Sequence, residues 1–325
     1  MSNDSNNTQY ILEVHNLKKY FPIETNFFGK PTRYLHAVDD VSFNLKSGTT
    51  IGVVGESGCG KTTLGRTILR LYNTDGGQII FDGDDITNLK RGQMQKYRTD
   101  IQLIFQDPYS SLPPRMTVGD IISEAVRVHN IVPKEEVRDY VRDIMHKCGL
   151  QPQYYDRYPH EFSGGQRQRI GIARAVVLNP ELIIADEPIS ALDVSIQAQV
   201  INLLNDLRNN LGLTILFIAH DLSVVKYFSD RIAVMYFGKI VELATSDELF
   251  AHPLHPYTKS LLSAIPLPDP HYEKNRKRVV YNPLADHDYS VQGPTLREVE
   301  PGHLVSCNDE EFERYLAEVK VSTAE

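Results

Sequence analysis

Eight consecutive residues have the types and spacing of a loop that binds phosphate groups. The pattern G-x-x-x-x-G-K-[ST] is met by Gly55-Glu56-Ser57-Gly58-Cys59-Gly60-Lys61-Thr62. Glycines permit positive φ, so the backbone can turn several N–H groups toward an anion. Lys61 would contact the β and γ phosphates, and the Thr62 hydroxyl would ligate Mg²⁺. The alternative is a glycine-rich turn that matches the pattern by chance.

Two carboxylates follow an apolar stretch later in the chain. The residues from Leu182 to Ala185 are apolar and lead directly into Asp186 and Glu187. Asp186 is placed to hold Mg²⁺ through water, and Glu187 to orient or deprotonate an attacking water. Acids at the end of a strand can instead cap a helix or lie at a solvated edge. Their occurrence together with a phosphate loop favours the catalytic interpretation.

A second segment with glycines precedes a predicted helix. It reads Ser163-Gly164-Gly165-Gln166. Glycines followed by a helix N-terminus can bind an anion, because the first N–H groups of a helix have no partner within it. In isolation, a serine that caps a helix after a loose turn is the better explanation. The position of the segment between the phosphate loop and Asp186 favours the anion site.

Apolar strands and amphipathic helices must position these residues. Around the phosphate loop we expect a strand over Thr49 to Val54 and a helix over Lys61 to Leu71. Further strands are expected at Gln78 to Phe81, Ile101 to Phe105, Leu182 to Ala185 and Thr214 to Ala219. A helix is expected over Ser195 to Leu211, with Asp193 as its N-cap. Arg231 to Val241 is predicted to form a hairpin that turns at Gly238.

The segment from about 108 to 180 has a different, helical pattern. Apolar residues recur at helical spacing over Val118 to Val128, Glu135 to Cys148 and Gly164 to Leu178. The predicted fold class is therefore α/β: a P-loop nucleoside-triphosphatase core with a mostly parallel sheet, an antiparallel flank, an inserted helical subdomain and a C-terminal appendage.

The two ends of the chain differ from this core. Met1 to Gln9 is polar and is predicted to be a disordered lead-in. Near the N-terminus we expect a short strand over Ile11 to Val14, a loop over Pro22 to Arg33 and a strand over Ala37 to Leu45. Residues 266–325 are interpreted as an appendage with a short helix over Asp309 to Val319. Its basic cluster, 274–278, is either a solvated loop or a contact with anionic lipid.

Composition limits the classes of function. The 325 residues carry a formal net charge of −8, which argues against a basic surface for nucleic acid. The three cysteines, Cys59, Cys148 and Cys307, have no metal-ligand spacing and indicate no disulfide framework. Apolar runs are too short to span a bilayer, so we expect any contact with a membrane to be made through a partner.

The order of the motifs resembles that of the ATP-binding subunits of ABC transporters over about residues 10 to 265. The phosphate loop matches Walker A, Phe105-Gln106-Asp107-Pro108 the Q-loop, and Phe162 to Arg169 the signature motif. Ile183 to Glu187 matches Walker B, Ser190-Ala191-Leu192-Asp193 the D-loop, and His220 the switch histidine. The resemblance implies an ATPase that uses ATP and Mg²⁺, with residues 10–265 as its ATP-binding domain.

The resemblance also implies roles for single residues. Catalysis would depend on Glu187, His220, Gln106 and Lys61, and Mg²⁺ would be held by Thr62, Gln106 and Asp186. His220 would bond the γ-phosphate and Glu187, although a lone histidine after a strand is more often structural. The nucleotide would be contacted by Thr63 and by the residues of the phosphate loop, which are Gly55, Glu56, Ser57, Gly58, Cys59, Gly60, Lys61 and Thr62. The ring of Phe21, or that of its neighbour Tyr20, would stack on adenine. Ser163, Gly164, Gly165, Gln166 and Asp193 would act on the nucleotide of a second ATPase subunit.

Within these transporters the chain is most similar to the F-type subunit of oligopeptide and dipeptide importers. This similarity rests on four parts of the sequence: Phe105 to Leu112, Pro159 to Phe162, His255 to Thr258 with Leu261 to Pro266, and Glu298 to His303. Many relatives hold an iron–sulfur cluster in the appendage, but one thiol, Cys307, cannot ligate one, so we expect none.

The implied assembly is peripheral, at the cytoplasmic face of the cell membrane. Its partners would be a D-type ATPase in a heterodimer, two membrane permease subunits and, indirectly, an extracellular substrate-binding protein, with no nucleic acid. An importer of dipeptides, nickel or another small substrate is the alternative. A soluble ABC ATPase that acts on nucleic acid is a remote one.

Overall fold

The structure is a computed structural model that describes residues 10–27, 30–265 and 278–322. Its contacts divide the chain into two compact units, each assembled from separate stretches. Where it is described, the first unit comprises Met1–His15, Phe43–Thr50 and Gly65–Ile218, and the second comprises Asn16–Ser42, Ile51–Leu64 and Ala219–Glu325. The predicted lead-in, Met1 to Gln9, lies outside the described residues.

Three parallel strands form the centre of the first unit. They are β6 (Ile101–Ile104), β7 (Leu182–Asp186) and β8 (Thr214–Ile218), with β7 in the middle. Every residue of β7 and β8 is buried, which explains why both read as continuous apolar runs rather than as alternating ones. Asp186 is the last residue of β7, at the carboxyl edge of these strands. The α/β class is confirmed.

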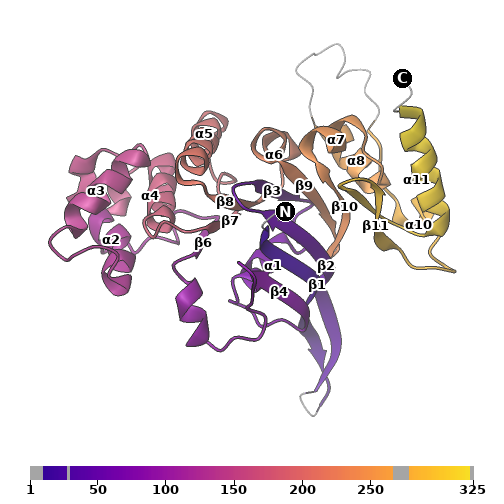
Figure 1. Cartoon of the computed structure of the whole chain (residues 1–325), viewed down its shortest axis with the longest axis horizontal. Coiled ribbons are helices and arrows are strands. Elements are labelled where there is room, and N and C mark those ends of the chain that lie inside the picture. The colour runs from indigo at the N-terminus through magenta and orange to yellow at the C-terminus, as the bar shows by residue number, and fades with distance from the viewer. Residues whose placement is uncertain (1–9, 28–29, 266–277, 323–325) are drawn as a thin grey trace, which may run out of the picture. The chain divides into compact units, whose positions relative to one another are not determined.

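A second sheet, of order β2-β1-β4-β5, corresponds to the predicted flank, and its strands β4 and β5 pair antiparallel. Its strands are β1 (Tyr10–Thr25), β2 (Pro31–Lys46), β4 (Gly76–Phe81) and β5 (Asp84–Asp85). The expected loop over Pro22 to Arg33 is wrong, because both long strands continue through most of it. Their outer halves form a two-stranded ribbon (Figure 1). A strand of such a ribbon has one unpaired side, so a proline without an N–H group can be accommodated.

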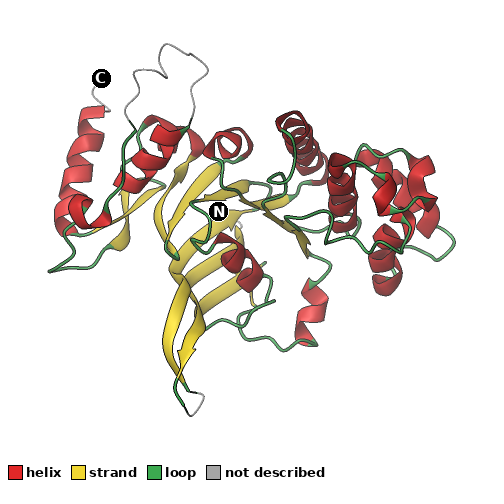
Figure 2. Cartoon of the chain, turned by 180° about the vertical axis from the view of Figure 1, so that it is seen from behind, coloured by secondary structure: helices red, strands yellow, loops and turns green. Residues whose placement is uncertain are grey.

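The helical part of the first unit follows the predicted pattern. It contains α2 (Val118–His129), α3 (Val137–Lys147) and α4 (Gly164–Val176), with the short 3-10 helices η2 (Pro152–Asp156) and η3 (Pro159–Glu161). α2 packs on both α3 and α4. Figure 2 shows this block as helices without strands. The unit also contains η1 (Gln93–Tyr97) and the long helix α5 (Val194–Leu211).

The second unit contains the strand that precedes the phosphate loop. β3 (Thr50–Val54) is parallel to β9 (Arg231–Tyr236), and β9 forms the predicted hairpin with β10 (Lys239–Thr245). Helix α1 (Lys61–Ile68) follows the loop and is three residues shorter than expected. Within its described residues the unit also contains the helices α6 (Leu222–Phe228), α7 (Ser246–Ala251), α8 (Pro256–Ala264), α10 (Pro283–Asp286) and α11 (Asp309–Ser322).

The C-terminal appendage extends the sheet of the second unit. β11 (Thr295–Glu300) and β12 (His303–Cys307) form an antiparallel hairpin, and β12 pairs with β10. The predicted helix is α11, and a small core of Leu254, Val299, Val305, Cys307 and Tyr315 lies beneath it. The hairpin was not predicted. Of the basic cluster, only Arg278 lies within the described residues.

In the described parts of the chain, no helix combines the length and the apolar character needed to cross a bilayer.

A buried carboxylate joins the appendage to the rest of the second unit. Glu242 in β10 is fully buried. Its Oε1 accepts from the N–H of Leu254 at 2.8 Å and lies 2.8 Å from Nε2 of His303 in β12, while its Oε2 accepts from the N–H of His255 at 3.1 Å. Buried polar groups are costly unless they are paired, so these partners depend on one another.

We therefore expect Glu242→Ala to lower the free energy of unfolding by about 3–5 kcal/mol, because it leaves two buried N–H groups and a histidine without their acceptor. Urea unfolding of the full chain measures this. The matched control is Glu313→Ala on the exposed side of α11, which should change the free energy by less than about 0.5 kcal/mol. Equal unfolding midpoints for the two variants would contradict the structural role of Glu242.

Candidate active site

The phosphate loop, Gly55 to Thr62, requires glycine at two positions for steric reasons. Gly55 has φ +154° and Gly60 has φ +111°. A Cβ at Gly55 would lie 2.1 Å from the carbonyl oxygen of Met235, and one at Gly60 would lie 1.9 Å from that of Ala37. The loop thus passes against backbone in the second unit and leaves no space for a side chain.

Lys61, the first residue of α1, is held inside the loop. The residue as a whole is 4% exposed. Its Nζ donates to the carbonyl oxygens of Gly55 at 2.7 Å and Glu56 at 2.9 Å, and lies 3.8 Å from Sγ of Cys59. These neighbours are all neutral. A buried ammonium among neutral acceptors favours the binding of an anion beside it.

The other polar side chains of the loop have different environments. Burial raises the pKa of the Cys59 thiol, against the opposing effect of Lys61, so the thiol is held in its protonated form. Thr62 and Thr63 lie half-buried in the first turn of α1. Glu56, Ser57 and Gly58 are exposed.

In the first unit, the two predicted acids lie at the end of β7, where Asp186 is its last residue and Glu187 follows it. Asp186 is 3% exposed, and its Oδ2 lies 3.9 Å from Nη2 of Arg66. Glu187 follows with φ +46°, a left-handed conformation that is uncommon for a residue with a side chain. Its N–H donates to the carbonyl oxygen of Ile218 at 3.0 Å, which holds the strained residue in place. Such strain concentrates at functional sites.

Gln106 is brought directly to Glu187. Its Nε2 donates to Oε2 of Glu187 at 2.8 Å, across 81 residues of sequence. Gln106 follows β6 and Glu187 follows β7, and these are neighbouring parallel strands. An amide and a carboxylate that lie within hydrogen-bond distance of each other at the ends of these strands can together orient a water molecule.

The Ser163 segment begins α4 with a complete capping box. Ser163 Oγ accepts from the N–H of Gln166 at 3.4 Å, and Gln166 Oε1 accepts from the N–H of Ser163 at 3.0 Å. Gly164 and Gly165 occupy the first helical turn. A Cβ at Gly165 would lie 2.5 Å from Cγ2 of Ile196 in α5. The capping interpretation is confirmed, and the anion-binding role stays a prediction.

Asp193 occupies the predicted N-cap position of α5. Its backbone oxygen accepts from the N–H groups of Ile196 and Gln197, both at 2.9 Å. The side chain makes no capping hydrogen bond, so the predicted cap is correct in position but not in mechanism.

His220 and the aromatic candidates lie in the second unit. His220 is exposed after β8, and the preceding Ala219 N–H donates to the carbonyl oxygen of Val53 at 3.1 Å. The Tyr20 ring stacks on His36 at 4.1 Å, and its hydroxyl donates to Asp39 at 2.6 Å. Phe21, on the alternate side of β1, has Lys19 Nζ 5.2 Å from its ring. Pairing of His220 with Glu187 and stacking of Phe21 on adenine stay predictions.

Two contacts of the site were not predicted. Arg66 approaches Asp186, and the hydroxyl of Tyr257 accepts from the N–H of Glu56 at 3.1 Å. For Arg66 the sequence contains no specific signal beyond its place on the helix after the loop. Tyr257 lies in the stretch from His255 to Thr258 that marks the subfamily. That stretch was recognised in the sequence, but no structural role was assigned to it.

Comparisons with known proteins agree with this geometry. Residues 38–190 match the model of the family described as ABC transporter, and residues 241–288 match that of the oligopeptide/dipeptide transporter C-terminal region.

Curated relatives are similar over nearly the whole chain. The chain is 54% identical to an oligopeptide transport ATP-binding protein of Bacillus subtilis over 310 residues, which cover 95% of this chain and 99% of that one. It is 53% identical to a dipeptide transport ATP-binding protein of Lactococcus lactis over 282 residues, which cover 86% and 90%.

Solved structures show the same fold. The structure of cbiO1 from Clostridium perfringens, part of an ABC transporter complex, has a TM-score of 0.65 at 29% identity, and the match covers 75% of this chain and 92% of that one. A dimeric ATP-binding cassette in a post-hydrolysis state, bound to ADP and Pi, has a TM-score of 0.65 at 26% identity and covers 72% and 98%. The chain therefore belongs to the family of ATP-binding proteins of oligopeptide and dipeptide ABC transporters.

Proposed function

We propose that the chain binds and hydrolyses ATP to energise oligopeptide uptake through an ABC importer. The single observation that carries the proposal is the hydrogen bond between Gln106 and Glu187, at the carboxyl ends of β6 and β7. This bond supports the proposal because it brings the carboxylate that would act as general base beside an amide that would orient water. Glu187 has a left-handed backbone conformation, which is uncommon outside functional sites. Peptide uptake as the outcome is supported by the names of the relatives.

Phosphoryl transfer depends mostly on positioning and on stabilisation of charge. Lys61 would hold the β and γ phosphates of ATP, together with the loop N–H groups. Glu187 would take the proton of the attacking water, which Gln106 would orient. His220 would bond the γ-phosphate, and Phe21 would stack on adenine.

Mg²⁺ fits the chemistry of the predicted ligands. Thr62, Gln106 and Asp186 offer a hydroxyl, an amide and a carboxylate oxygen, which are hard donors of the kind Mg²⁺ prefers. Asp186 is buried at the end of β7, and its Oδ2 lies 3.9 Å from Nη2 of Arg66. The metal would neutralise phosphate charge when bound.

A second ATPase subunit is part of the proposal. The N-terminus of α4, with Ser163 to Gln166, would contact the nucleotide held by that subunit, which we take to be a D-type relative in a heterodimer. Ser163 and Gln166 are partly exposed, as a contact with another subunit requires. A cassette with the same fold is a dimer in its solved structure.

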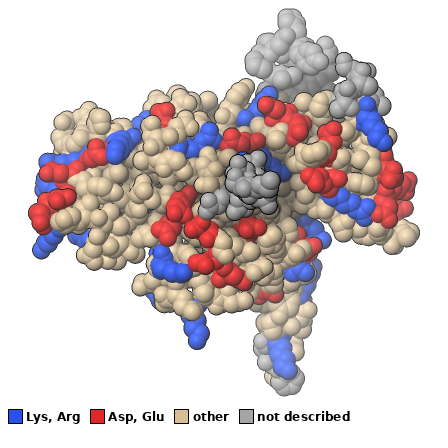
Figure 3. Space-filling model, viewed as in Figure 1, with Lys and Arg blue, Asp and Glu red and all other residues tan. Residues whose placement is uncertain are grey.

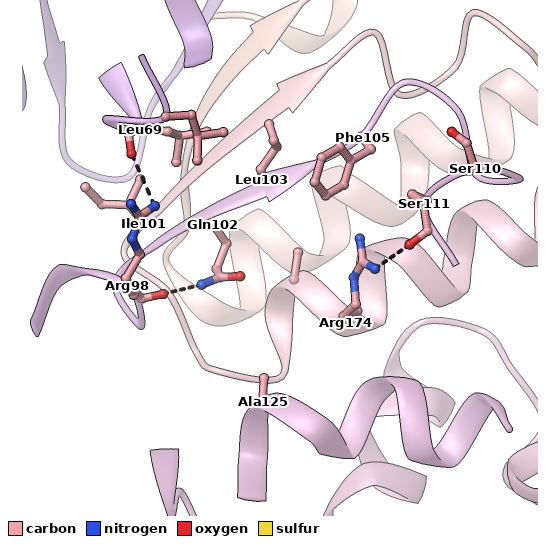
Figure 4. A pocket seen from close by; sticks show the side chains of 12 residues that line it. Leu69, Arg98, Ile101, Gln102, Leu103, Phe105, Ser110, Ser111, Ala125 and Arg174 are labelled. Carbon is pink, nitrogen blue, oxygen red and sulfur yellow. Dashed lines mark hydrogen bonds between the residues drawn. The ribbon is translucent and has the colours of Figure 1, made fainter. Parts of the chain in front are cut away.

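A pocket in the first unit is the proposed contact with a permease subunit. It has a volume of about 640 Å³ and lies between β6, the loop after Gln106 and helices α2 and α4 (Figure 4). Arg174 lines it and donates to the carbonyl oxygen of Ser111 at 2.6 Å, with its guanidinium 5.3 Å from the Phe105 ring. Because Phe105 precedes Gln106, a permease segment in this pocket would act directly on the water-orienting residue. Two permease subunits would hold the ATPase pair at the cytoplasmic face of the membrane.

The alternatives differ in substrate and in partner. Dipeptide uptake is favoured as the second candidate by the 53% identity to a dipeptide transport protein. Action on nucleic acid is disfavoured by the net charge of −8 and by the interspersed acidic and basic residues on the face shown in Figure 3.

We expect Glu187→Gln to bind ATP as the wild type does but to hydrolyse it about 10²–10³ times more slowly, because the amide cannot accept the water proton. Phosphate release and nucleotide titration measure the two quantities. Glu181→Gln is the matched control, since it makes the same change at an exposed residue just before β7. Normal turnover by Glu187→Gln would refute the role of Glu187.

We expect Ala125→Trp to prevent assembly with the permease, because an indole would fill the pocket from α2. The variant should lose co-purification of permease subunits from membranes while its ATP affinity stays unchanged. Val128→Trp, at an exposed position of the same helix, should leave both the co-purification and the ATP affinity unchanged. Undiminished co-purification with Ala125→Trp would exclude this pocket as the docking site.

A further inference from the structure

A buried tyrosine touches the phosphate loop from the far end of the chain. Tyr257, the second residue of α8, is 2% exposed, and its hydroxyl oxygen accepts from the backbone N–H of Glu56 at 3.1 Å. Both residues belong to the second unit. Glu56 is the second residue of the phosphate loop, so a side chain beyond residue 250 takes part in fixing the conformation of that loop.

The backbone N–H and the backbone carbonyl oxygen of Glu56 both form hydrogen bonds with side chains. Its N–H is bonded by Tyr257, and its carbonyl oxygen accepts from Nζ of Lys61 at 2.9 Å. One residue therefore connects the tyrosine to the charged group that would contact phosphate. A shift of the Glu56 backbone would move an acceptor of Lys61 at the same time.

Tyr257 is itself fixed by its neighbours in sequence. Its N–H donates to Nδ1 of His255 at 3.1 Å, which caps the start of α8. Burial, with smaller effects of His287 and Lys259, lowers the pKa of His255 to about 3, so the imidazole is neutral and its Nδ1 can accept this bond. Glu242 accepts from the N–H of His255 at 3.1 Å.

The appendage closes around the tyrosine ring. The Tyr236 ring lies 4.4 Å from that of Tyr257, and the Tyr281 ring lies 5.4 Å away. Tyr281 belongs to the appendage, and the ring of His287 lies 5.6 Å from it. His287 Nδ1 in turn lies 2.5 Å from Glu311 in α11. The tyrosine that bonds the loop is therefore packed between β9 and the appendage.

We propose that Tyr257 is a positioning residue for ATP binding, through which the C-terminal appendage stabilises the nucleotide-binding form of the phosphate loop. The inference concerns the loop and ATP, and it rests on the ATPase activity rather than on peptide as the substrate. It assigns a role to the appendage, which contributes none of the predicted site residues. A tyrosine that served only as apolar core would not need its hydroxyl.

Tyr257→Phe tests this in the full chain, since it removes the hydroxyl and keeps the ring. Loss of one hydrogen bond that fixes the loop should weaken ATP binding about three- to tenfold. In steady-state hydrolysis KM should rise by the same factor with kcat little changed, because binding is lost equally from the ground state and the transition state. A purely structural defect would instead lower the active fraction, and so the apparent kcat, at constant KM.

The control is Tyr315→Phe, the same change in a buried tyrosine of the appendage that packs in the core with Leu254 and Cys307. It should leave ATP affinity and KM unchanged. Hydrogen exchange gives a second readout that needs no nucleotide: the Glu56 amide should exchange faster in Tyr257→Phe than in the wild type or the control.

Wild-type ATP affinity and unchanged exchange at Glu56 in Tyr257→Phe would overturn the proposal. Equal effects of Tyr257→Phe and Tyr315→Phe would also overturn it, since they would reveal a general loss of stability. A failure of peptide uptake in membranes would leave these measurements intact, because they use ATP and the chain alone.

Discussion

The absence of space for a side chain at Gly55 and Gly60 is the constraint on which the site depends. Each glycine lies against a backbone carbonyl group and has positive φ, so the loop can follow its path only without a Cβ. That path places the carbonyl oxygens of Gly55 and Glu56 around Nζ of Lys61. A buried positive charge results, and in the proposed function this charge attracts the phosphates of ATP. Burial of β3, whose five residues are all buried, holds the loop at its start.

Sequence patterns predicted the parts of the fold whose signal is local. Continuous apolar runs predicted β7 and β8, and helical spacing predicted α2, α3 and α4. Motif order supplied the candidate site residues, whose roles stay predictions. The loop expected over Pro22 to Arg33 was wrong because turn-forming residues there are tolerated in a two-stranded ribbon. The hairpin of β11 and β12 was missed, although Thr295 to Cys307 has a Pro-Gly turn at its centre, since a pattern of charged and apolar residues also suits a solvated segment.

Long-range contacts were beyond the reach of pattern alone. The bond from Gln106 to Glu187 spans 81 residues, and that from Glu56 to Tyr257 spans 201. Motif order implied the first, because both residues follow neighbouring parallel strands. Nothing in the residue types implied the second, since a buried tyrosine beside a proline is an ordinary helix start. The buried Glu242, bonded to β12 and to the start of α8, explains how the appendage reaches the loop.

The central claim is that this chain converts ATP hydrolysis into work on a membrane partner. The most direct measurement is the rate of ATP hydrolysis by the assembly purified from membranes through a tag on this chain, with and without an oligopeptide-loaded binding protein. The account predicts that permease subunits co-purify and that the loaded binding protein raises the rate. A rate that is the same with and without the loaded binding protein would contradict it.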